Sequence, residues 1–326
     1  MKAEILALLR ERKDYVSGRE LSERFQVTRT AVWKSMNRLK EEGFSIETRQ
    51  NRGYRLLAAG EVFGKNELES RLRTKWAGKN LKYYAELDST NTQAKKEAEW
   101  GAAHGTLLVA DRQTAGRGRR GRGWDSPADT NLYFSLVLKP AFPPAQASML
   151  TLVMAHSVAL AVAEESGLEA RIKWPNDVVV KRRKCCGILT EMSAELDYIH
   201  YVVVGVGINV GKQEFPPPLR EKATCLDLES GREISRSVLL AKVLLHFEED
   251  YAVFCEKGDL SGLMESYNRL LVNRGAQVRV LDPKGDYDGT AGGITSTGQL
   301  TVETAEGKRV EVYAGEVSVR GIYGYT

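Results

Sequence analysis

The sequence predicts an α+β protein in three parts, and three observations support this prediction. Two short capped helices followed by a hairpin, within residues 1–60, indicate an N-terminal winged helix-turn-helix. Residues 81–271 mix apolar strands with long apolar helices, which indicates a central mixed α/β domain. Residues 272–326 alternate short strands with Gly, Asp and Thr turns, which is typical of a small SH3-like β-barrel. Residues 61–80 are polar and helical in pattern, and we expect them to be a connector.

The N-terminal part carries two helix-start signals in close succession. Ser17 is a predicted N-cap with a glutamate three residues later, and Thr28 is the predicted N-cap of the next helix. That second helix, over 28–42, is the expected recognition helix, and Gly43 is expected to end it. The following stretch, FSIETRQNRGYRLL, has alternating apolar residues around a basic tip, so it predicts a β-hairpin that serves as the wing.

The formal charge of +4 is unevenly distributed along the chain. Residues 1–60 hold 13 Lys and Arg against 8 Asp and Glu, or +5, so the remaining residues sum to −1. An alternative is a small helical interaction domain whose charges are merely solvated. DNA binding is favoured because cations occupy the helix start and the wing, where phosphates would lie. The predicted DNA contacts are Thr28, Arg29, Thr30, Lys34, Arg49 and Arg52, with Arg55 on the same wing.

The composition predicts a cytoplasmic protein that does not enter a membrane. The four cysteines form no repeated CxxC pattern, and the adjacent pair Cys185 and Cys186 is a poor disulfide candidate, so we expect reduced thiols. The first residues, MKAEILALLRERKD, carry charges throughout and do not resemble a secretory signal. No run of apolar residues reaches the roughly 18 that a membrane span needs.

The segment GRGRRGRG at 116–123 combines four glycines with four arginines, and Trp124 follows it. A P-loop would need a GK[ST] ending, which is absent here, and an RGG-type tail should not lie between two strong strands. A plain solvated loop remains the alternative, although it would hold several like charges together without a partner. We expect a lid over an anionic small molecule, because glycine lets backbone N–H groups approach an oxyanion and arginine binds phosphate in bidentate fashion.

Four further motifs accompany this loop in a fixed order. They are LDSTNT at 87–92, KWPNDV at 173–178, RRKCCGIL at 182–189 and GVGINVG at 205–211. Together with the glycine-arginine loop, this set resembles the biotin–protein ligase family. The winged helix resembles that of the bifunctional branch, whose ligase is also the biotin-operon repressor. The resemblance extends over essentially the whole chain, including the C-terminal barrel.

The resemblance implies an ATP-dependent enzyme that forms biotinyl-5′-AMP and passes biotin to a lysine of the biotin carboxyl carrier protein. The carrier would be a subunit of acetyl-CoA carboxylase or a pyruvate carboxylase. Biotinyl-5′-AMP would also be the corepressor, and the liganded protein would bind operator DNA as a homodimer. ATP and Mg²⁺ are the implied cofactors.

Site roles follow from the same resemblance, motif by motif. The implied catalytic residues are Lys184, Arg117 and Arg119. The implied biotin-binding residues are Ser89, Thr90, Asn91, Gln113, Arg117, Gly118, Arg119, Lys184 and Gly187. The implied ATP and adenylate residues are Arg119, Arg122, Trp124, Lys173, Asn176, Asp177 and Asn209, with Asp177 as a Mg²⁺ ligand.

Alternatives remain at this level. The core could belong to a lipoate-type ligase, although an extended thioalkyl acid has no ureido group for a Ser-Thr-Asn cluster. It could also be an inactive ligase core in a ligand-sensing repressor. Within KWPNDV, Trp174 and Pro175 are expected to be a structural turn. Cys185 and Cys186 replace residues that are more often small or aliphatic, so the packing beside Lys184 is expected to differ from that of the family.

Overall fold

A computed structural model describes residues 1–57, 62–282, 285–314, 318–321 and 325–326. The chain divides into two compact units by contact density. The first comprises Met1–Arg73 and Ser235–Ala241, and the second Thr74–Ile234 and Lys242–Thr326. Each unit is described by itself below.

The first unit contains the winged helix that the sequence predicts. Its elements are α1 (Lys2–Arg12), α2 (Gly18–Arg24), α3 (Arg29–Glu41), β1 (Ile46–Arg49) and β2 (Gly53–Leu56). Both predicted caps are present, since Ser17 Oγ accepts a hydrogen bond from the Glu20 amide and Thr28 Oγ1 accepts one from the Ala31 amide. Strands β1 and β2 pair antiparallel, and Gly53 begins β2 at a φ of 106°. A Cβ there would lie 2.1 Å from the Val16 carbonyl oxygen, so only glycine fits.

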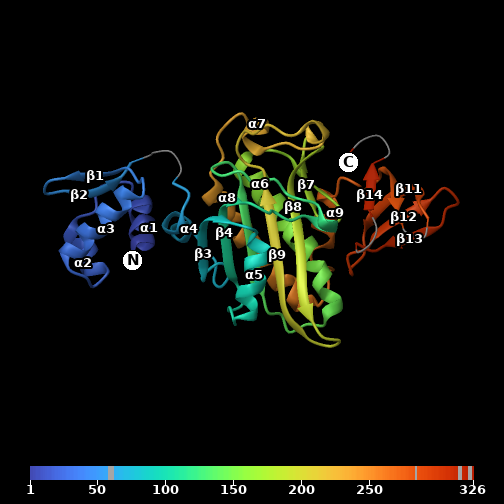
Figure 1. Cartoon of the computed structure of the whole chain (residues 1–326), viewed down its shortest axis with the longest axis horizontal. Helices are drawn as coiled ribbons and strands as arrows, with labels where there is room; N and C mark the ends of the chain where they lie inside the picture. Colours follow the sequence, from blue (N-terminus) through green and yellow to red (C-terminus); the bar gives the residue numbers. More distant parts are fainter. Residues whose placement is uncertain (58–61, 283–284, 315–317, 322–324) are drawn as a thin grey trace. The chain divides into compact units, whose positions relative to one another are not determined.

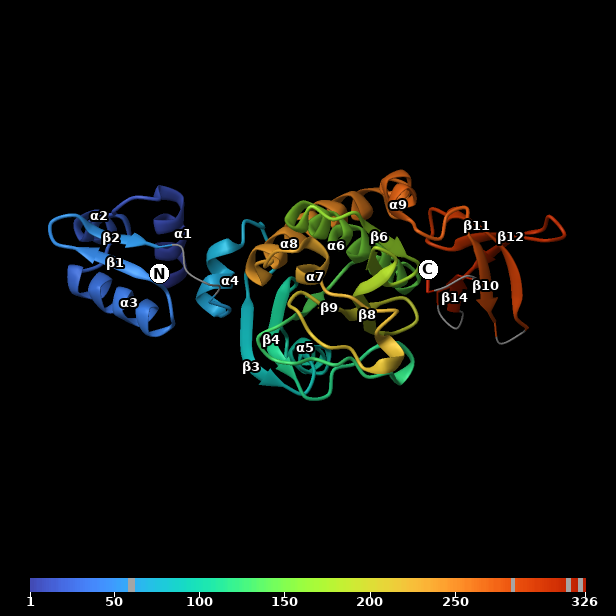
Figure 2. The ribbon, with the colours of Figure 1, turned by 90° about the horizontal axis from the view of Figure 1, so that it is seen from above.

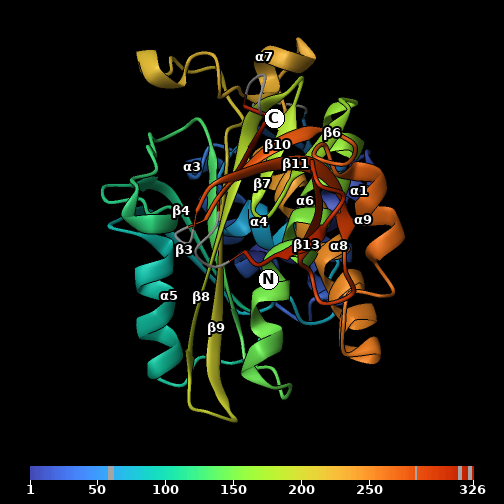
Figure 3. The same cartoon turned by 90° about the vertical axis from the view of Figure 1, so that its right-hand side faces the viewer.

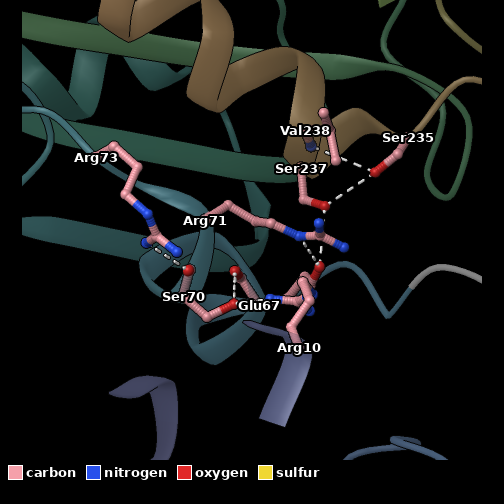
Figure 4. Close-up of polar contacts among 8 residues, drawn as sticks. All are labelled: Arg10, Glu67, Ser70, Arg71, Arg73, Ser235, Ser237 and Val238. Atoms are coloured by element: carbon pink, nitrogen blue, oxygen red, sulfur yellow. Dashed lines mark hydrogen bonds and ion pairs between the residues drawn. The ribbon is translucent and has the colours of Figure 1, made fainter. Parts of the chain in front are cut away.

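Helix α4 (Lys65–Arg71) lies within the predicted connector and packs on α1. Its Glu67 is buried among polar groups from three helices (Figure 4). The carboxylate accepts hydrogen bonds from Arg10 of α1 at 2.6 Å, from Arg71 at 2.7 Å and from Ser237 at 3.2 Å. Ser237 belongs to the first turn of α8 (Arg236–Lys257). One carboxylate therefore joins α1, α4 and the start of α8.

The second unit is built on a seven-stranded sheet (Figure 1). Its strands are β3 (Leu81–Leu87), β4 (Thr106–Gln113), β5 (Leu132–Leu138), β6 (Ala170–Lys173), β7 (Asp177–Val180), β8 (Arg183–Ala194) and β9 (Ile199–Ile208). Their order in the sheet is β3-β4-β5-β9-β8-β7-β6, with β3 and β4 parallel and the other pairs antiparallel. Strand β5 is buried along its whole length, as expected for a central strand covered on both faces.

The two faces of this sheet are covered by different helices (Figure 3). Helix α5 (Thr90–Glu99) packs on β4, β5 and β9, while α6 (Leu150–Ser166) packs on β6, β7, β8 and β9. Figure 2 shows α6 beside α8, and the buried His156 of α6 contacts Asp250 of α8 at 2.8 Å. The stretch Pro144–Ser166 is long and apolar enough to cross a membrane, but 72% of its most apolar part is buried inside the protein. This stretch serves as a core helix of the sheet.

The residues after α9 (Met264–Leu270) form a second sheet of short antiparallel strands. They are β10 (Gln277–Leu281), β11 (Tyr287–Ile294), β12 (Leu300–Thr304), β13 (Arg309–Val312) and β14 (Ser318–Gly321). The described strands form an open sheet with β13 and β14 as its edges, whereas the sequence predicted a closed barrel. Trp174 is buried and its indole N–H donates to the Gly298 carbonyl at 3.0 Å, which agrees with its expected structural role.

The shorter elements lie in the loops of the second unit. They are α7 (Leu226–Ser230) and the 3-10 turns η1 (Arg119–Gly121), η2 (Pro144–Met149) and η3 (Pro217–Leu219).

Candidate active site

A small cavity lies on the α5 face of the seven-stranded sheet, with a volume of about 50 Å³. Most of the ligase residues that the resemblance implied line it. They are Ser89, Thr90, Asn91, Gln113, Arg117, Gly118, Arg119, Trp124, Asn176, Lys184 and Gly187. The motifs are up to about a hundred residues apart in sequence, and the sheet brings them to one place.

Part of the cavity lining consists of uncharged hydrogen-bonding groups at the start of α5. Gln113 Oε1 accepts from the Thr90 amide at 2.8 Å, and Ser135 Oγ donates to Asn91 Oδ1 at 2.6 Å. The Asn91 amide donates to the Leu189 carbonyl and to Glu191 Oε2. These partners hold the side chains in fixed rotamers, so the hydroxyl and amide groups are preorganised for a neutral polar ligand.

The floor of the cavity is formed by three glycines, of which the sequence analysis assigned Gly187 but not Gly205 and Gly207. Gly205 and Gly207 of β9 are two residues apart and therefore face the same side of the sheet, and Gly187 pairs with Gly207 across the β8–β9 register. A Cβ on Gly205 would lie 1.8 Å from Asn91 Oδ1, and one on Gly207 would lie 2.6 Å from the Trp124 indole nitrogen. Two glycines at alternate positions of a valine-rich strand are the signal that could have identified this floor.

The glycine-arginine loop is folded back on itself above this floor. The Trp124 amide donates to the Gly116 carbonyl at 2.9 Å, and the Gly118 amide donates to the Arg122 carbonyl at 2.7 Å. The Trp124 ring lies against Gly187 and Gly207, and the Lys184 ammonium is 5.2 Å from its centroid. Trp124 therefore fills space that a ligand resting on the glycines would need.

Arg119 is the loop arginine that enters the site most deeply. Its guanidinium donates to Asn176 Oδ1 at 3.0 Å and also to the Ala314 carbonyl of the C-terminal sheet region. Burial, together with the neighbouring Arg120, lowers the pKa of Arg119 below its ordinary value. Guanidinium groups stay protonated at neutral pH even so, and Arg119 remains a cation beside the cavity.

Lys184 is held by its backbone and by an ion pair. The register between β7 and β8 shifts at this point, and such a bulge re-aims the side chains beside it. The Lys184 amide donates to the Lys222 carbonyl at 2.7 Å, and its ammonium lies 2.6 Å from Asp177 Oδ1. The amine thus faces the cavity with one carboxylate partner.

Four residues of the implied ATP subsite do not line the cavity: Arg122, Lys173, Asp177 and Asn209. Lys173 is buried, with its ammonium 3.4 Å from the centroid of the Tyr325 ring. The Asn209 amide donates to the Thr224 carbonyl at 3.1 Å, so this group is engaged within the protein. Asp177 lies just behind Lys184, and Tyr325, which the sequence analysis did not single out, contacts it.

Two acidic side chains near the cavity, Glu191 and Asp177, are paired with cations. Glu191 lies 2.9 Å from Lys95 and 3.5 Å from Arg117. Burial alone would raise the pKa of Glu191, but the hydrogen bonds from Lys95 and Asn91 hold it below its ordinary value. Three cations (Arg117, Arg119 and Lys184) thus face two carboxylates here, those of Glu191 and Asp177.

Gly205→Ala is expected to raise the KM for the ligand that contacts Thr90 and Asn91 at least about tenfold. This is the scale of losing a well-made hydrogen bond. The added methyl would collide with Asn91 and push it off Ser135 and Leu189. Steady-state kinetics measure the effect. Gly64→Ala is the control, because the backbone at Gly64 is extended and a Cβ there meets no atom within 4 Å. A Gly205→Ala enzyme with wild-type KM would show that Asn91 does not touch the ligand.

The winged helix carries the second candidate site, for DNA. Arg29, Thr30 and Lys34 are exposed on α3, and Arg49 and Arg52 are exposed at the wing tip. Trp33 lies on the same stripe of α3 with 54% of its side chain exposed, and the sequence analysis overlooked it. Arg55 differs from the others because it pairs with Glu47 at 2.7 Å. The basic groups thus occupy the two elements with which winged helices contact DNA.

Three family models match the chain in the order of its parts. They are the HTH domain over residues 2–55, the Biotin/lipoate A/B protein ligase family over 83–209 and the Biotin protein ligase C terminal domain over 275–320. The chain is 36% identical over 310 residues to the bifunctional ligase/repressor BirA of Bacillus subtilis, covering 94% of each chain. The chain belongs to the biotin protein ligase family. It is an enzyme of that family, and its winged helix places it with the bifunctional ligase/repressors.

Other relatives agree with this assignment. The BirA of Escherichia coli K12 is 28% identical over 94% of each chain. The biotin–[acetyl-CoA-carboxylase] ligase of Mycobacterium tuberculosis is 33% identical over 73% of this chain and 88% of its own length. A solved structure, the biotin protein ligase from Aquifex aeolicus in complex with biotin and ATP, matches with a TM-score of 0.66 and 36% identity. That match covers 74% of this chain and 99% of the Aquifex chain.

Proposed function

We propose that this ligase activates biotin with ATP, forming biotinyl-5′-AMP, and transfers the biotinyl group to a lysine of a biotin carboxyl carrier protein. The observation that carries the proposal is the mixed lining of one cavity. Uncharged donors and acceptors from Thr90 and Asn91 line it together with the cations Lys184, Arg117 and Arg119. A ligand with a neutral ureido head and a carboxylate tail offers partners to both kinds of group.

In the first step a biotin carboxylate oxygen attacks the α-phosphorus of ATP, and pyrophosphate leaves with the electrons of the broken P–O bond. Two anions must meet, so cations fixed in advance lower the barrier most. Lys184 is placed to offset the charge of both oxyanions, while Arg117 and Arg119 close over them from the loop. In the second step the acceptor amine attacks the acyl carbon, AMP leaves, and the amine loses a proton.

Ligand entry requires the site to open. Because the Trp124 ring lies against Gly187 and Gly207, biotin cannot rest on these glycines until Trp124 moves. We propose that Trp124 leaves the glycine floor when ligand binds and then covers the adenylate side, where Asn176, Arg122 and Asn209 would serve the nucleotide. A closed loop would also keep water from the mixed anhydride.

ATP commonly reacts as its Mg²⁺ complex, and Asp177 is the residue that the sequence offered as a ligand. The arrangement does not fit a metal at this position. Asp177 Oδ1 pairs with Lys184 at 2.6 Å and Oδ2 accepts from Tyr325 at 2.5 Å. We therefore assign Mg²⁺ to the nucleotide substrate and route no step through Asp177-bound metal.

We propose further that the protein is a cytoplasmic repressor of its own biotin operon, with biotinyl-5′-AMP as corepressor. One winged helix reads few base pairs, and proteins of this type usually bind paired half-sites as dimers, so a homodimer is expected when the adenylate is bound. The acceptor would be a carrier subunit of acetyl-CoA carboxylase or a pyruvate carboxylase. Names of the relatives above support both activities.

We retain the functional division 1–60, 61–80, 81–271 and 272–326 as part of this proposal. The matched family segments 2–55, 83–209 and 275–320 each fall inside one of these ranges and support it. For 272–326 we propose an SH3-like arrangement. Strands β10 to β13 follow one another as a meander, and β14 returns to pair with β10, which is the order from which a small barrel closes.

Biotin-dependent exchange of pyrophosphate into ATP tests the ligase activity directly. The purified protein is expected to catalyse exchange with biotin and not with lipoate or octanoate. Exchange with lipoate in place of biotin would identify a lipoate-type ligase. Absence of exchange with any acid, while biotin still alters DNA binding, would identify a sensing repressor with an inactive core.

Footprinting on the protein's own biotin-operon promoter tests the repressor activity. Protection is expected to increase when biotin and ATP are both added. Arg29→Ala and Arg52→Ala should each weaken binding and lower the slope of log affinity against log salt by about one, because each removes one phosphate contact. Arg279→Ala is the control, since Arg279 pairs with Asp288 in the C-terminal sheet. Equal protection with and without biotin plus ATP would contradict the corepressor role.

A further inference from the structure

Tyr325 is tied to the catalytic centre by two contacts. Its hydroxyl donates to Asp177 Oδ2 at 2.5 Å, and its ring lies under the Lys173 ammonium, 3.4 Å from the centroid. Burial and the neighbouring Asp177 raise the pKa of this phenol, so it remains a neutral donor at physiological pH. Thr326 follows Tyr325, and its backbone oxygen accepts a hydrogen bond from the Arg182 guanidinium at 3.0 Å. This contact helps to hold residues 325–326 in place.

The contact continues to Lys184. Asp177 uses its second oxygen, Oδ1, to pair with the Lys184 ammonium at 2.6 Å. Both side chains of this pair are largely buried, with 14% of Asp177 and 24% of Lys184 exposed. The Tyr325 hydroxyl contacts the Asp177 carboxylate, which in turn contacts the Lys184 ammonium. Lys184 lines the cavity, so this chain of contacts reaches it.

These contacts limit the mobility of the Lys184 side chain. The four-carbon stem of Lys184 is flexible, and its ammonium can rotate freely, so a point charge at its end needs a fixed partner. A carboxylate free to turn about its own χ angles would be a poor partner. Tyr325 removes that freedom, because its donated hydrogen bond fixes which Asp177 oxygen faces Lys184.

We propose that Tyr325 is a positioning residue for the adenylation step, acting through Asp177 on Lys184, and that Asp177 orients this lysine instead of binding a metal. The proposal rests on the proposed function, because it needs Lys184 to act on the carboxylate and the α-phosphate. It gives Tyr325, which follows β14 in the sequence, a task in catalysis.

Tyr325→Phe tests the proposal because it removes only the hydroxyl and keeps the ring under Lys173. In single-turnover assays of the full chain, the maximal rate of adenylate formation is expected to fall at least about tenfold, the scale of a hydrogen bond to a charged group. The KM values for biotin and ATP should stay within about twofold of the wild-type values, since Tyr325 does not line the cavity. Tyr267→Phe is the matched control. Tyr267 is also buried, and its hydroxyl has no hydrogen-bond partner among the described residues.

A double-mutant cycle separates positioning from simple loss of structure. In an Asp177→Asn background, Tyr325→Phe should change the remaining rate by less than about twofold, because the path to Lys184 is already broken. Asp177→Asn should also leave the Mg²⁺ concentration for half-maximal rate within about twofold of the wild type. Additive rate losses, or a much higher Mg²⁺ requirement in Asp177→Asn, would overturn the proposal.

A second readout needs no substrate. Reductive methylation of the unliganded protein at limiting reagent, followed by mass spectrometry, reports how firmly the Lys184 amine is held. Tyr325→Phe is expected to increase labelling of Lys184 several-fold and leave Lys222 unchanged. Unaltered Lys184 labelling together with a wild-type adenylation rate would refute the positioning role. If instead the wild-type protein forms no biotinyl-5′-AMP, the proposed function itself fails.

Discussion

Lys184→Ala is expected to slow biotinyl-5′-AMP formation at least about a hundredfold, the scale of losing one preorganised donor in a catalytic site. The ammonium is the cation that lies between the loop and the sheet floor, against both Trp124 and Asp177. Removing it leaves two substrate anions to approach each other with only the arginines to offset their repulsion. Rapid-quench measurement of adenylate in a single turnover isolates this step from product release.

Lys222→Ala is the control for this experiment. Lys222 is exposed, and its carbonyl accepts the hydrogen bond from the Lys184 amide, so it shares the local backbone without facing the cavity. Its rate should match the wild type. Because Lys184→Ala would also leave Asp177 without its cation, circular dichroism must show that the variant is folded. A folded Lys184→Ala protein with a normal rate of adenylation would remove Lys184 from the mechanism.

The sequence predicted most of the local structure because local signals determine it. The Ser17 and Thr28 side chains cap their helices by accepting hydrogen bonds from amides three residues later in the chain. Gly53 is required because the hairpin approaches the Val16 backbone closely there. The motifs of the cavity could be assigned through the family resemblance, and the sheet register then explains why they meet. The glycine floor could have been found from the alternate spacing of Gly205 and Gly207 within a strand.

Features that depend on distant pairings could not be predicted from local patterns. Tyr325 and Asp177 are 148 positions apart, and nothing in either local sequence indicates that they meet. Whether the C-terminal strands close into a barrel depends on contacts between β13 and β14, and turn spacing cannot specify those. For the same reason, the motif that contains Asp177 does not indicate that this carboxylate contacts Lys184 of β8 and Tyr325.

Glu67→Ala is expected to destabilise the first unit by about 3 kcal/mol, the scale of breaking a buried ion pair by removing one partner. Only 5% of the Glu67 side chain is exposed, whereas 25% of Arg10 and 30% of Arg71 are. Burial lowers the pKa of Arg10 and the Glu67 carboxylate opposes that shift, so its loss leaves a poorly solvated cation facing Arg71. The repulsion between two arginines adds to the lost hydrogen bonds in Figure 4.

Hydrogen exchange of the α3 amides in the full chain measures this loss, because those amides report opening of the winged helix itself. Glu69→Ala is the matched control: Glu69 lies on the same helix, but its ion pair with Lys65 is 3.7 Å long and partly exposed. Pairs of that kind contribute about 0.5 kcal/mol or less. If the α3 amides are as well protected from exchange in Glu67→Ala as in Glu69→Ala, the Glu67 carboxylate does not hold α1, α4 and the start of α8 together. Faster exchange confined to the first unit, with an unchanged rate of adenylation, is the result that the contacts around Glu67 predict.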